Sequence, residues 1–264
     1  MNVLITGVAS GIGLALTKRF LENNHTVYGI DINEVLTRQN LISFKCDITN
    51  ETTLKQVENY LVDNNVKLDM IINVAGIHKM ASLVESNYDD LKKVIEINLC
   101  GTMLVNKTFH KHLTKKGKII IVTSEVASFD PLPFNGLYNV SKTALEAYAQ
   151  ALRQELNLLG QKVITIQPGA IETPLSGGSL TATEKLANDT VLYQKQACHF
   201  LYLVKNFMGK PIKTEKLSKF IYKVSIKKRP KYTYKIHRSL GLVLLSILPK
   251  SWQCLIVKVL LNRK

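Results

Sequence analysis

The chain has 264 residues, enough for one large domain with a buried core. Apolar residues make up 46% and charged residues 21%, which is typical of globular proteins and excludes a disordered or collagen-like chain. The charge is uneven, because residues 195–264 hold 17 of the 35 Lys and Arg but only one of the 20 Asp and Glu. We therefore expect a nearly neutral domain over residues 1–194 and a strongly basic region over 195–264.

The cysteines and the first residues of the chain give no sign of secretion. Cys46, Cys100, Cys198 and Cys254 share no CxxC or other metal-binding spacing, and disulfide scaffolds are denser in cysteine. The chain does not open with a charged segment followed by a long apolar run, as a secretory signal does. We expect reduced thiols, no metal site and a cytoplasmic protein.

Short apolar runs rich in Val and Ile alternate with segments of helical periodicity. Strands are predicted at residues 3–5, 27–30, 42–46, 70–73, 119–123 and 163–166. Helices are predicted at residues 12–21, 53–62, 91–112 and 138–159. This alternation predicts an α/β fold, a Rossmann-like doubly wound parallel sheet with helices on both faces. The pattern fades after about residue 170, so a basic C-terminal helical extension is expected.

The first predicted strand runs into a glycine-rich turn, TGVASGIG at residues 6–13, and a helix follows. A strand that turns sharply into a helix presents free N–H groups and the positive end of the helix dipole, which suit a pyrophosphate. Gly7 allows the tight turn, Gly11 lets the backbone approach the phosphates, and Gly13 allows close helix–strand packing. Together with an acid 18 residues after Gly13, the turn predicts dinucleotide binding.

That acid, Asp31, ends the second predicted strand. Its carboxylate can accept hydrogen bonds from both adenosine ribose hydroxyls and would repel a 2′-phosphate. No base follows it at Ile32 and Asn33, and Ser10 in the turn is not basic. We therefore expect NAD(H) rather than NADP(H) as the cofactor. The alternative is a surface Asp31, with Arg38 receiving the phosphate.

Tyr138 and Lys142 open a predicted helix four residues apart, so they share one face. Bringing a phenol from its usual pKa of about 10 to about 7.5 requires about 3.4 kcal/mol of differential stabilisation. An ammonium at about 4 Å supplies about 4 kcal/mol at an effective dielectric constant of about 20. The spacing predicts that Lys142 alone makes Tyr138 a usable acid/base, although Tyr and Lys also decorate solvated helix faces.

Ser124 follows the predicted strand at 119–123. At the carboxyl end of a parallel strand it would face the crevice where ligands bind, and its hydroxyl could polarise a substrate carbonyl beside Tyr138. The alternative is an ordinary cap or turn serine.

In combination, these motifs resemble the short-chain dehydrogenase/reductase family over at least residues 1–175. The matching segments follow the family's order and spacing: TGVASGIG at 6–13, CDI at 46–48, NVAG at 73–76, IN at 97–98, Ser124, YNVSK at 138–142 and PGAIET at 168–173. One departure is Val74, where the family usually has a second Asn.

The resemblance implies roles for the matching residues. Tyr138 would be the acid/base and Ser124 would orient the substrate oxygen. Lys142 would hold the nicotinamide ribose and lower the Tyr138 pKa, and Asn98 would hold a water in a proton relay to Lys142. Cofactor contacts are further implied for Thr6, Gly7, Ser10, Gly11, Ile12, Gly13, Asp31, Asp47, Ile48, Asn73, Ala75, Gly76, Pro168, Gly169, Ile171 and Thr173.

Within that set, the resemblance places Asp47 and Ile48 at the adenine. Asn73, Ala75 and Gly76 would form the cofactor floor. Residues 168–173 would border the nicotinamide. The alternatives are an Asn98 that faces its own helix backbone and an Asp47 that caps the next helix.

The sequence thus predicts an NAD-dependent enzyme that interconverts an alcohol and a ketone or aldehyde by hydride transfer. The resemblance implies that residues 176–208 form a mobile lid over the substrate, and the apolar stripe at 200–207 favours a lipophilic substrate. That stripe could instead pack on the body or at a subunit contact. Two other functions remain open: an acyl-carrier-linked 3-oxoacyl reductase using NADPH, and a non-catalytic NAD-sensing or scaffold protein.

The basic region mixes cations with aromatics at 227–235 and ends in two short apolar segments, 240–248 and 252–261. Neither reaches the roughly 20 apolar residues of a spanning helix. Cations beside short apolar helices suit a helix that lies on a membrane, so 227–261 could hold the protein at the inner face of a membrane. The alternatives are packing on the body, on a partner subunit or on an acidic carrier protein. No nucleic-acid-reading module is recognised, and the family habit implies a dimer or tetramer.

Overall fold

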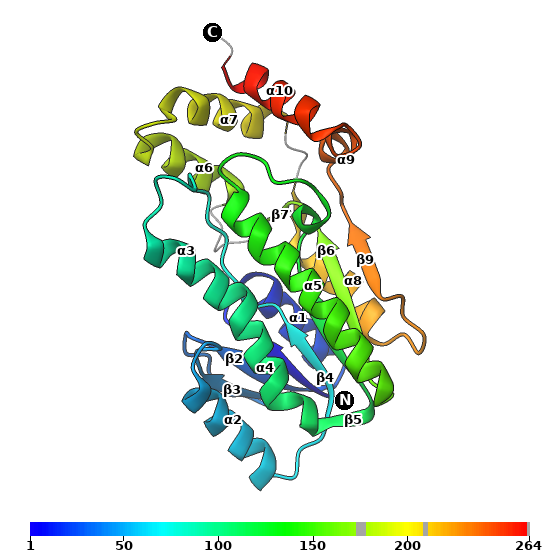
Figure 1. The fold of residues 1–264 in the computed structure, drawn as a ribbon. Helices are drawn as coiled ribbons and strands as arrows, with labels where there is room; N and C mark the ends of the chain where they lie inside the picture. The colour runs from blue at the N-terminus through cyan, green and yellow to red at the C-terminus, as the bar shows by residue number, and fades with distance from the viewer. Residues whose placement is uncertain (173–177, 208–210, 263–264) are drawn as a thin grey trace.

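A computed structural model describes residues 1–172, 178–207 and 211–262 (Figure 1). A seven-stranded sheet, in the order β3-β2-β1-β4-β5-β6-β9, lies at the centre, and all of its paired strands are parallel. Its strands are β1 (Asn2–Thr6), β2 (Thr26–Asp31), β3 (Leu41–Lys45), β4 (Leu68–Asn73), β5 (Leu113–Val122), β6 (Lys162–Pro168) and β9 (Thr233–Ile236). The predicted doubly wound parallel sheet is confirmed.

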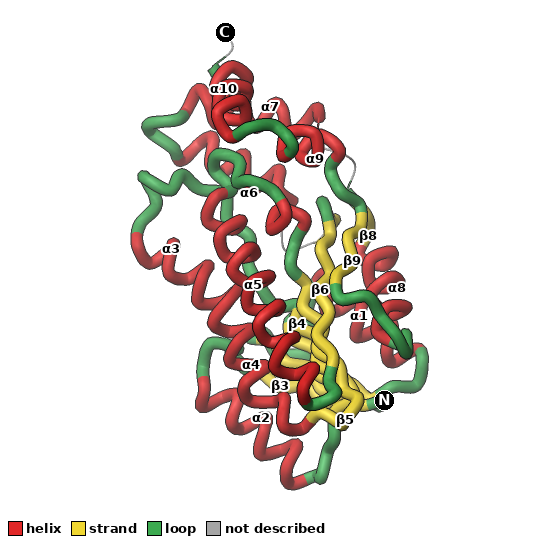
Figure 2. Tube along the Cα trace, turned by 45° about the vertical axis from the view of Figure 1, so that its right-hand side comes forward, coloured by secondary structure: helices red, strands yellow, loops and turns green. Residues whose placement is uncertain are grey.

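Helices cover both faces of this sheet (Figures 1 and 2). On one face, α1 (Gly11–Glu22) packs against α8 (Thr214–Ser225). On the other face lie α2 (Glu51–Asp63), α4 (Thr102–Phe109) and α5 (Gly136–Leu158). Successive strand residues point to opposite faces, so Leu4 joins the core under α2 and α5 while Val3 and Ile5 join the core under α1 and α8.

The predicted helix at 91–112 is one helical stretch with a break in its middle. It consists of α3 (Tyr88–Ile95), a π-helical turn (Glu96–Gly101), α4 and a final 3₁₀ turn (His110–His112). A π turn holds one extra residue and often marks a functional position. Here the turn contains Asn98, which is fully buried. The last residue of the turn is Gly101. A side chain there would be crowded, because a Cβ would lie 2.8 Å from the Ile48 side chain.

The C-terminal quarter contributes more to the sheet than its sequence indicates. Residues 195–264 were expected to form a helical extension, yet β9 pairs with β6 as an edge strand and α8 packs on α1. The β9 side chains are only partly buried, and the strand follows a basic segment, so its sequence lacks the apolar run of an internal strand. The boundary at residue 194 stays a prediction, with part of the second region built into the sheet layers.

Four helices lie beyond the carboxyl ends of β6 and β9 (Figure 1). They are α6 (Gly178–Asp189), α7 (Gln194–Phe207), α9 (Leu240–Ser246) and α10 (Lys250–Leu261). Phe200, Leu201 and Leu203 on α7 join a small apolar cluster with Phe134 and with Leu261 of α10, so these members of the α7 stripe and one face of α10 pack on the body. A two-stranded sheet of β7 (Ile171–Glu172) and β8 (Ile212–Lys213) lies apart from the main sheet. Among the described helices, none has the length and apolar character needed to cross a bilayer.

Candidate active site

The glycines of the first turn are required by its backbone. Gly7 has φ of +78° and Gly11 has φ of +52°, a region that side chains with a Cβ rarely adopt. A Cβ on Gly13 would lie 1.9 Å from the Gly7 carbonyl oxygen, so α1 can start this close to the turn only with glycine there. The Gly7 N–H donates to Ile30 O at 2.7 Å, which ties the turn to the end of β2.

The start of α1 offers hydrogen-bond donors suited to a phosphate. Ser10 is the N-cap residue of α1, but its side chain makes no capping hydrogen bond among the described residues, and the first turn of α1 contains no acid. The first N–H groups of a helix have no partner within the helix. The residues present therefore fit the pyrophosphate of a dinucleotide, which Gly11, Ile12 and Gly13 would bind through their backbone N–H groups.

Thr6, directly before this turn, supports the neighbouring segment after β4. Its hydroxyl, at the end of β1, accepts hydrogen bonds from the N–H groups of Val74 and Ala75, both at 3.1 Å. The Thr6 residue is only 1% exposed, so it fixes the segment after β4 rather than facing a ligand. The contact at Val74 runs through its backbone, which explains how this departure from the family pattern is accommodated.

Asp31 lies where the end of β2 meets the turn. Its Oδ2 accepts from the Ala9 N–H and its Oδ1 from the Asn33 N–H, both at 2.9 Å. The Asn33 Nδ2 also donates to Oδ1, at 3.3 Å. These hydrogen bonds hold the carboxylate at the rim of the turn, and Oδ2 keeps a further lone pair for a ligand. Lys45 is the register partner of Asp31 on β3, so a cation also stands at this edge of the sheet.

Asp47 and Ile48 follow β3 and take different orientations. Asp47 is exposed, and its Oδ1 accepts from the N–H and the hydroxyl of Thr49 at 2.8 and 2.7 Å. The N-cap of α2 is Asn50, so Asp47 is not the capping residue. The Ile48 side chain is buried against Gly101, which leaves only its backbone for a ligand. A surface pocket lined by Asp47, Thr49 and Ile97, among others, lies beside the residue expected to contact adenine.

Tyr138 stands in the first turn of α5, and Ser124 follows β5. The Ser124 side chain also accepts from the Val126 N–H at 3.4 Å as the N-cap of a 3₁₀ turn (Glu125–Ser128), so the capping role and the site position coexist. Burial raises the pKa of Tyr138 to about 12, and a hydrogen bond with the Ser124 side chain opposes that rise only in part. The two hydroxyls are therefore neighbours, as the resemblance implies.

Lys142 lies beside Tyr138, whose pKa is raised by burial in the protein without cofactor. Its Nζ lies 5.6 Å from the centre of the Tyr138 ring and donates to Val122 O at 3.3 Å. The Lys142 residue is 5% exposed, and burial lowers its own pKa to about 8. Desolvation is the largest effect on the phenol in the protein without cofactor, so the lowering of the Tyr138 pKa by Lys142 stays a prediction.

Asn98 links the π turn to the segment after β4. Its Nδ2 donates to Ile77 O at 2.9 Å and to Ser141 Oγ at 3.0 Å, while its Oδ1 accepts from the Ile77 N–H at 2.8 Å. It therefore bonds neighbouring elements rather than its own helix. A Cβ on Gly76 would lie 2.9 Å from Asn98 Oδ1 and 3.6 Å from Lys142 Nζ, so Gly76 keeps the space between these side chains open. The relay through a water stays a prediction.

Asn73, expected on the cofactor floor, points into the protein. Its Nδ2 donates to Asn106 Oδ1 at 2.8 Å, and the Asn106 Nδ2 donates in turn to the Tyr148 hydroxyl at 3.3 Å. The Asn73 residue is 3% exposed and its Oδ1 is buried without a hydrogen-bond partner in the described part of the chain. The side chain thus supports the end of β4, and Ala75 and Gly76 remain the positions at the surface of the crevice.

The expected nicotinamide border begins at the end of β6. Pro168 is its last residue, and the Gly169 N–H donates to Ile236 O at 2.9 Å. A Cβ on Gly169 would lie 1.8 Å from the His237 carbonyl oxygen, so glycine is needed where β9 passes. Ile171 starts β7. Thr173 lies outside the described residues.

His78 belongs to the site although no pattern in the sequence predicts it. Its ring packs edge-on against the Tyr138 ring, with the centres 4.5 Å apart, and its Nε2 donates to Asn135 Oδ1 at 3.1 Å. Burial lowers the His78 pKa, so the ring is held in its neutral form. The contact comes from the segment after β4 and depends on how that segment folds back, which a single sequence does not reveal.

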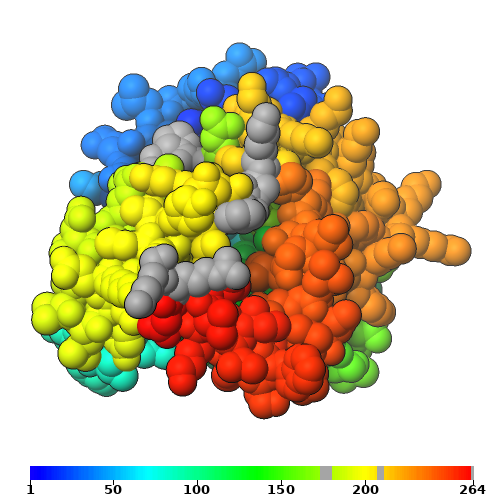
Figure 3. Space-filling view, turned by 90° about the horizontal axis from the view of Figure 1, so that it is seen from above, coloured from blue at the N-terminus to red at the C-terminus, as the bar shows by residue number. Residues whose placement is uncertain are grey.

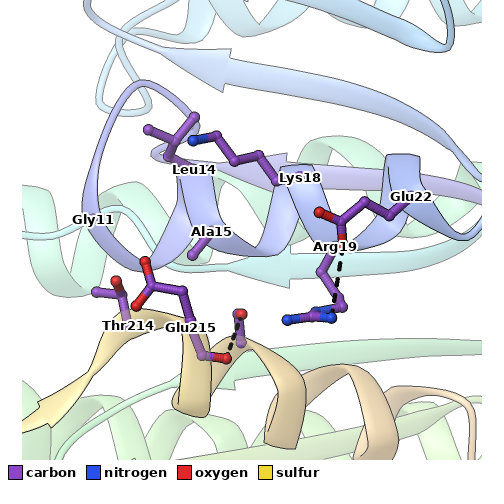
Figure 4. A pocket seen from close by; sticks show the side chains of 9 residues that line it. Gly11, Leu14, Ala15, Lys18, Arg19, Glu22, Thr214 and Glu215 are labelled. Atoms are coloured by element: carbon purple, nitrogen blue, oxygen red, sulfur yellow. Dashed lines mark hydrogen bonds and ion pairs between the residues drawn. The ribbon is translucent and has the colours of Figure 1, made fainter.

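A second hollow lies away from these side chains. Figure 4 shows a pocket of about 180 Å³ between α1 and α8. Gly11 lines one part of it, and Arg19 and Glu22, which form an ion pair at 3.6 Å, line another. None of the residues expected to act on substrate lines this pocket, so we assign the chemistry to the crevice at Tyr138.

Known proteins match the part of the chain that forms this site. A family model described as short chain dehydrogenase matches residues 1–184. The chain is 35% identical to the NADPH-dependent 1-acyldihydroxyacetone phosphate reductase of Schizosaccharomyces pombe over 199 residues, 72% of this chain and 67% of the relative. It is 25% identical to the 3-ketodihydrosphingosine reductase of Bacteroides thetaiotaomicron over 236 residues, 89% and 87% of the two chains.

A solved structure shares the fold over nearly the whole chain. The short chain dehydrogenase of Burkholderia cenocepacia J2315 in complex with NADP superposes with a TM-score of 0.74 at 18% identity, covering 97% of this chain and 96% of that one. This likeness shows the fold, and the family model together with the 35% identical relative shows the family. The chain belongs to the short-chain dehydrogenase/reductase family, whose members are oxidoreductases that use a nicotinamide cofactor.

Proposed function

We propose that this chain is an NAD(H)-dependent enzyme that interconverts a secondary alcohol and a ketone, or an alcohol and an aldehyde, on a lipophilic substrate. The observation that carries the proposal is the grouping of Ser124, Tyr138 and Lys142. The Ser124 side chain lies close enough to Tyr138 to lower its pKa, and the Lys142 ammonium lies 5.6 Å from the centre of the Tyr138 ring. A protein that only senses NAD has no need of this set.

Each side chain has a role that its surroundings support. Bound nicotinamide supplies or accepts the hydride. The Tyr138 hydroxyl takes the proton of the alcohol during oxidation and returns it during reduction. The Ser124 hydroxyl donates to the substrate oxygen, where negative charge develops. Lys142 reaches from α5 toward Gly76 and supplies the positive charge that favours the phenolate.

Replacing Tyr138 with Phe tests this assignment. The ring fits the same space, so Tyr138→Phe is expected to keep NADH affinity within about twofold and to lower turnover by a factor of about 1,000 or more. Turnover is measured as NADH absorbance with a panel of lipophilic and short-chain alcohols and ketones. Tyr148→Phe is the matched control, because Tyr148 also carries a buried hydroxyl on α5. A fully active Tyr138→Phe enzyme would refute the role.

The preference for NAD(H) rests on Asp31. Its carboxylate is held at the rim of the turn by the Ala9 and Asn33 N–H groups, where a negative charge repels a 2′-phosphate. Against it stand Lys45, the register partner of Asp31, and the NADPH dependence in the name of the fission-yeast relative. The comparison of KM for NADH and NADPH decides between them, and a preference for NADPH would overturn the proposal.

Substitutions at Asp31 and Lys45 show which of the two charges sets the preference for NADH or NADPH. Asp31→Ser is expected to lower KM for NADPH by about tenfold and to raise KM for NADH, because the carboxylate is both repulsive and a ribose acceptor. Lys45→Met, on the neighbouring strand, is expected to leave KM for NADH nearly unchanged. An enzyme in which Asp31→Ser changes neither constant has its selectivity elsewhere.

The lipophilic substrate is supported by the helices beyond the sheet. The partly buried Phe200 and Leu201 of α7, together with Phe134, form an apolar cluster between the sheet and α10. Both curated relatives have names that specify lipid-type carbonyl compounds, an acylated dihydroxyacetone phosphate and a keto sphingoid base. A long-chain ketone is therefore expected to show a lower KM than its short-chain analogue. Equal KM values across chain length would argue against it.

A further inference from the structure

The two C-terminal helices expose an apolar stripe each. On α9 the exposed residues recur at i, i+4 and i+7, and on α10 at i, i+3 and i+7, so each set lies on one helix face. These residues, which we call the tail surface, are Leu240 (72% exposed), Leu244 (55%), Ile247 (73%), Trp252 (62%), Leu255 (59%) and Val259 (52%).

The tail surface is left over after α10 has docked on the body. Leu261 is buried in the cluster with α7, and Val257 packs against the same cluster. Gln253 fixes the start of α10, because its Nε2 donates to Asp130 Oδ2 at 3.0 Å and to Leu248 O at 2.9 Å. The core of the chain therefore holds one face of α10, and the stripe on the other face contributes nothing to that packing.

The charges around this surface favour an anionic partner. Arg238 precedes α9, where it stacks over the Phe129 ring at 4.7 Å, while Lys258 lies on the exposed side of α10. Lys250 is in part neutralised, because it lies 3.7 Å from Asp130. Within α9 and α10, both described over their full length, no residue is acidic. A second copy of this chain would bring like charges together, whereas anionic lipid headgroups attract them.

We propose that the tail surface docks on an anionic lipid bilayer, with α9 and α10 lying in the plane of the headgroups. The helices have 7 and 12 residues, lengths that suit an interfacial helix rather than a span. Figure 3 shows that these helices (orange and red) form one side of a hollow whose other side is α6 and α7 (yellow). If the proposed function holds, a lipophilic substrate enters this hollow from the bilayer.

The chain carries its own probe, because Trp252 is its only tryptophan and lies in the tail surface. Tryptophan emission moves to shorter wavelength when the indole leaves water for the headgroup region. Mixed vesicles of phosphatidylglycerol and phosphatidylcholine are expected to produce this shift, and brominated acyl chains are expected to quench the emission. Pure phosphatidylcholine vesicles should do so at least about tenfold more weakly, and added salt should weaken the anionic case.

Variants of the full chain locate the contact. The double variant Leu244→Ser/Leu255→Ser is expected to lower vesicle binding by about tenfold to a hundredfold, since both side chains are exposed in the free protein and buried on docking. Lys258→Gln should lower it by about fivefold. The matched control is Leu36→Ser/Leu158→Ser, two leucines at 81% and 85% exposure outside this surface. All are exposed positions, and thermal unfolding checks that the variants fold.

Three results would overturn the proposal. The first is unchanged Trp252 emission with every vesicle, and the second is equal loss of binding in the control variant. The third is emission that moves to shorter wavelength with protein concentration alone, which assigns the surface to a second copy. A lack of activity on any tested alcohol with intact vesicle binding would refute the proposed function and leave the docking proposal standing.

Discussion

Replacing Lys142 with Met is the most direct test of how the Tyr138 hydroxyl becomes a base. Burial raises the Tyr138 pKa to about 12, and Lys142, whose Nζ lies 5.6 Å from the ring centre, is the nearby cation on the same helix face. The lysine itself has a pKa of about 8 because it is buried, so it is charged below that pH and loses its charge above it. The two groups therefore titrate as a coupled pair.

The size of the effect follows from the distance. If the 5.6 Å between Lys142 Nζ and the Tyr138 ring centre is taken as the separation of the two charges, they interact by about 3 kcal/mol at an effective dielectric constant of about 20, which corresponds to about 2 pH units in the pKa of the phenol. This effect is too small to lower the Tyr138 pKa from about 12 to a value near neutral pH. The remaining stabilisation of the phenolate must come from the liganded site, where the oxidised nicotinamide ring is a second positive charge. Lys142→Met should therefore shift the Tyr138 titration without abolishing it.

The assay is the pH dependence of alcohol oxidation at saturating cofactor, followed as NADH absorbance from about pH 6 to about pH 11. The rate rises with pH as the phenol deprotonates. Below about pH 8, where Lys142 is charged, Lys142→Met should lower the rate by about a hundredfold, and this loss should shrink at higher pH. Lys223→Met, at an exposed lysine of α8, is the control. A Lys142→Met profile that coincides with that of the unmodified enzyme would refute the electrostatic role.

Three further changes test other parts of the structure. Glu58 is desolvated, but its bonds to Lys111, Lys55 and His112 outweigh this and lower its pKa to about 2, so its ionisation stabilises the fold above about pH 4.5. That stabilisation, about 3 kcal/mol, is lost as pH falls toward 2, and urea unfolding should show a weaker pH dependence in Glu58→Gln. Gly13→Ala places a methyl group against the Gly7 carbonyl, so NADH affinity, measured by its fluorescence, should fall more than about a hundredfold. His78→Ala removes a ring contact with Tyr138 and should lower kcat by about two- to tenfold, whereas His78→Phe should retain more of it; equal kcat in both variants would exclude this packing role.

The sequence predicted the parts of the fold in which local pattern and burial agree. Strands such as β1 and β4 are apolar because they are buried on both faces, and the glycine turn is recognisable because its backbone tolerates no other residue. The edge strand β9 has no such signature, since Tyr234 and Lys235 alternate there beside a basic segment. Such a segment becomes a strand only because β6 has an unpaired edge beside it, and that depends on the tertiary structure rather than on the local sequence.

Within the site, residue types were easier to predict than their environment. The spacing placed Tyr138 and Lys142 on one face of α5, and the structure agrees. The pKa of Tyr138 depends on how much water is excluded around it, and that depends on His78, Ser124 and other groups far apart in sequence. A rule based on spacing includes the cation but not the desolvation, so the sequence alone does not reveal that burial raises the Tyr138 pKa in the protein without cofactor.

The C-terminal quarter is anchored at the same rim of the sheet as the reacting groups. The carboxylate of Glu125, directly after Ser124, accepts from the Ser239 N–H at 2.7 Å, and burial raises the Glu125 pKa. On the neighbouring strand, Gly169 donates to Ile236 and leaves no room for a side chain beside His237. The segment that joins β9 to α9 thus rests on both the Ser124 turn and the end of β6. The docking proposed for α9 would therefore place a membrane within a few residues of the Glu125–Ser239 hydrogen bond, next to Ser124.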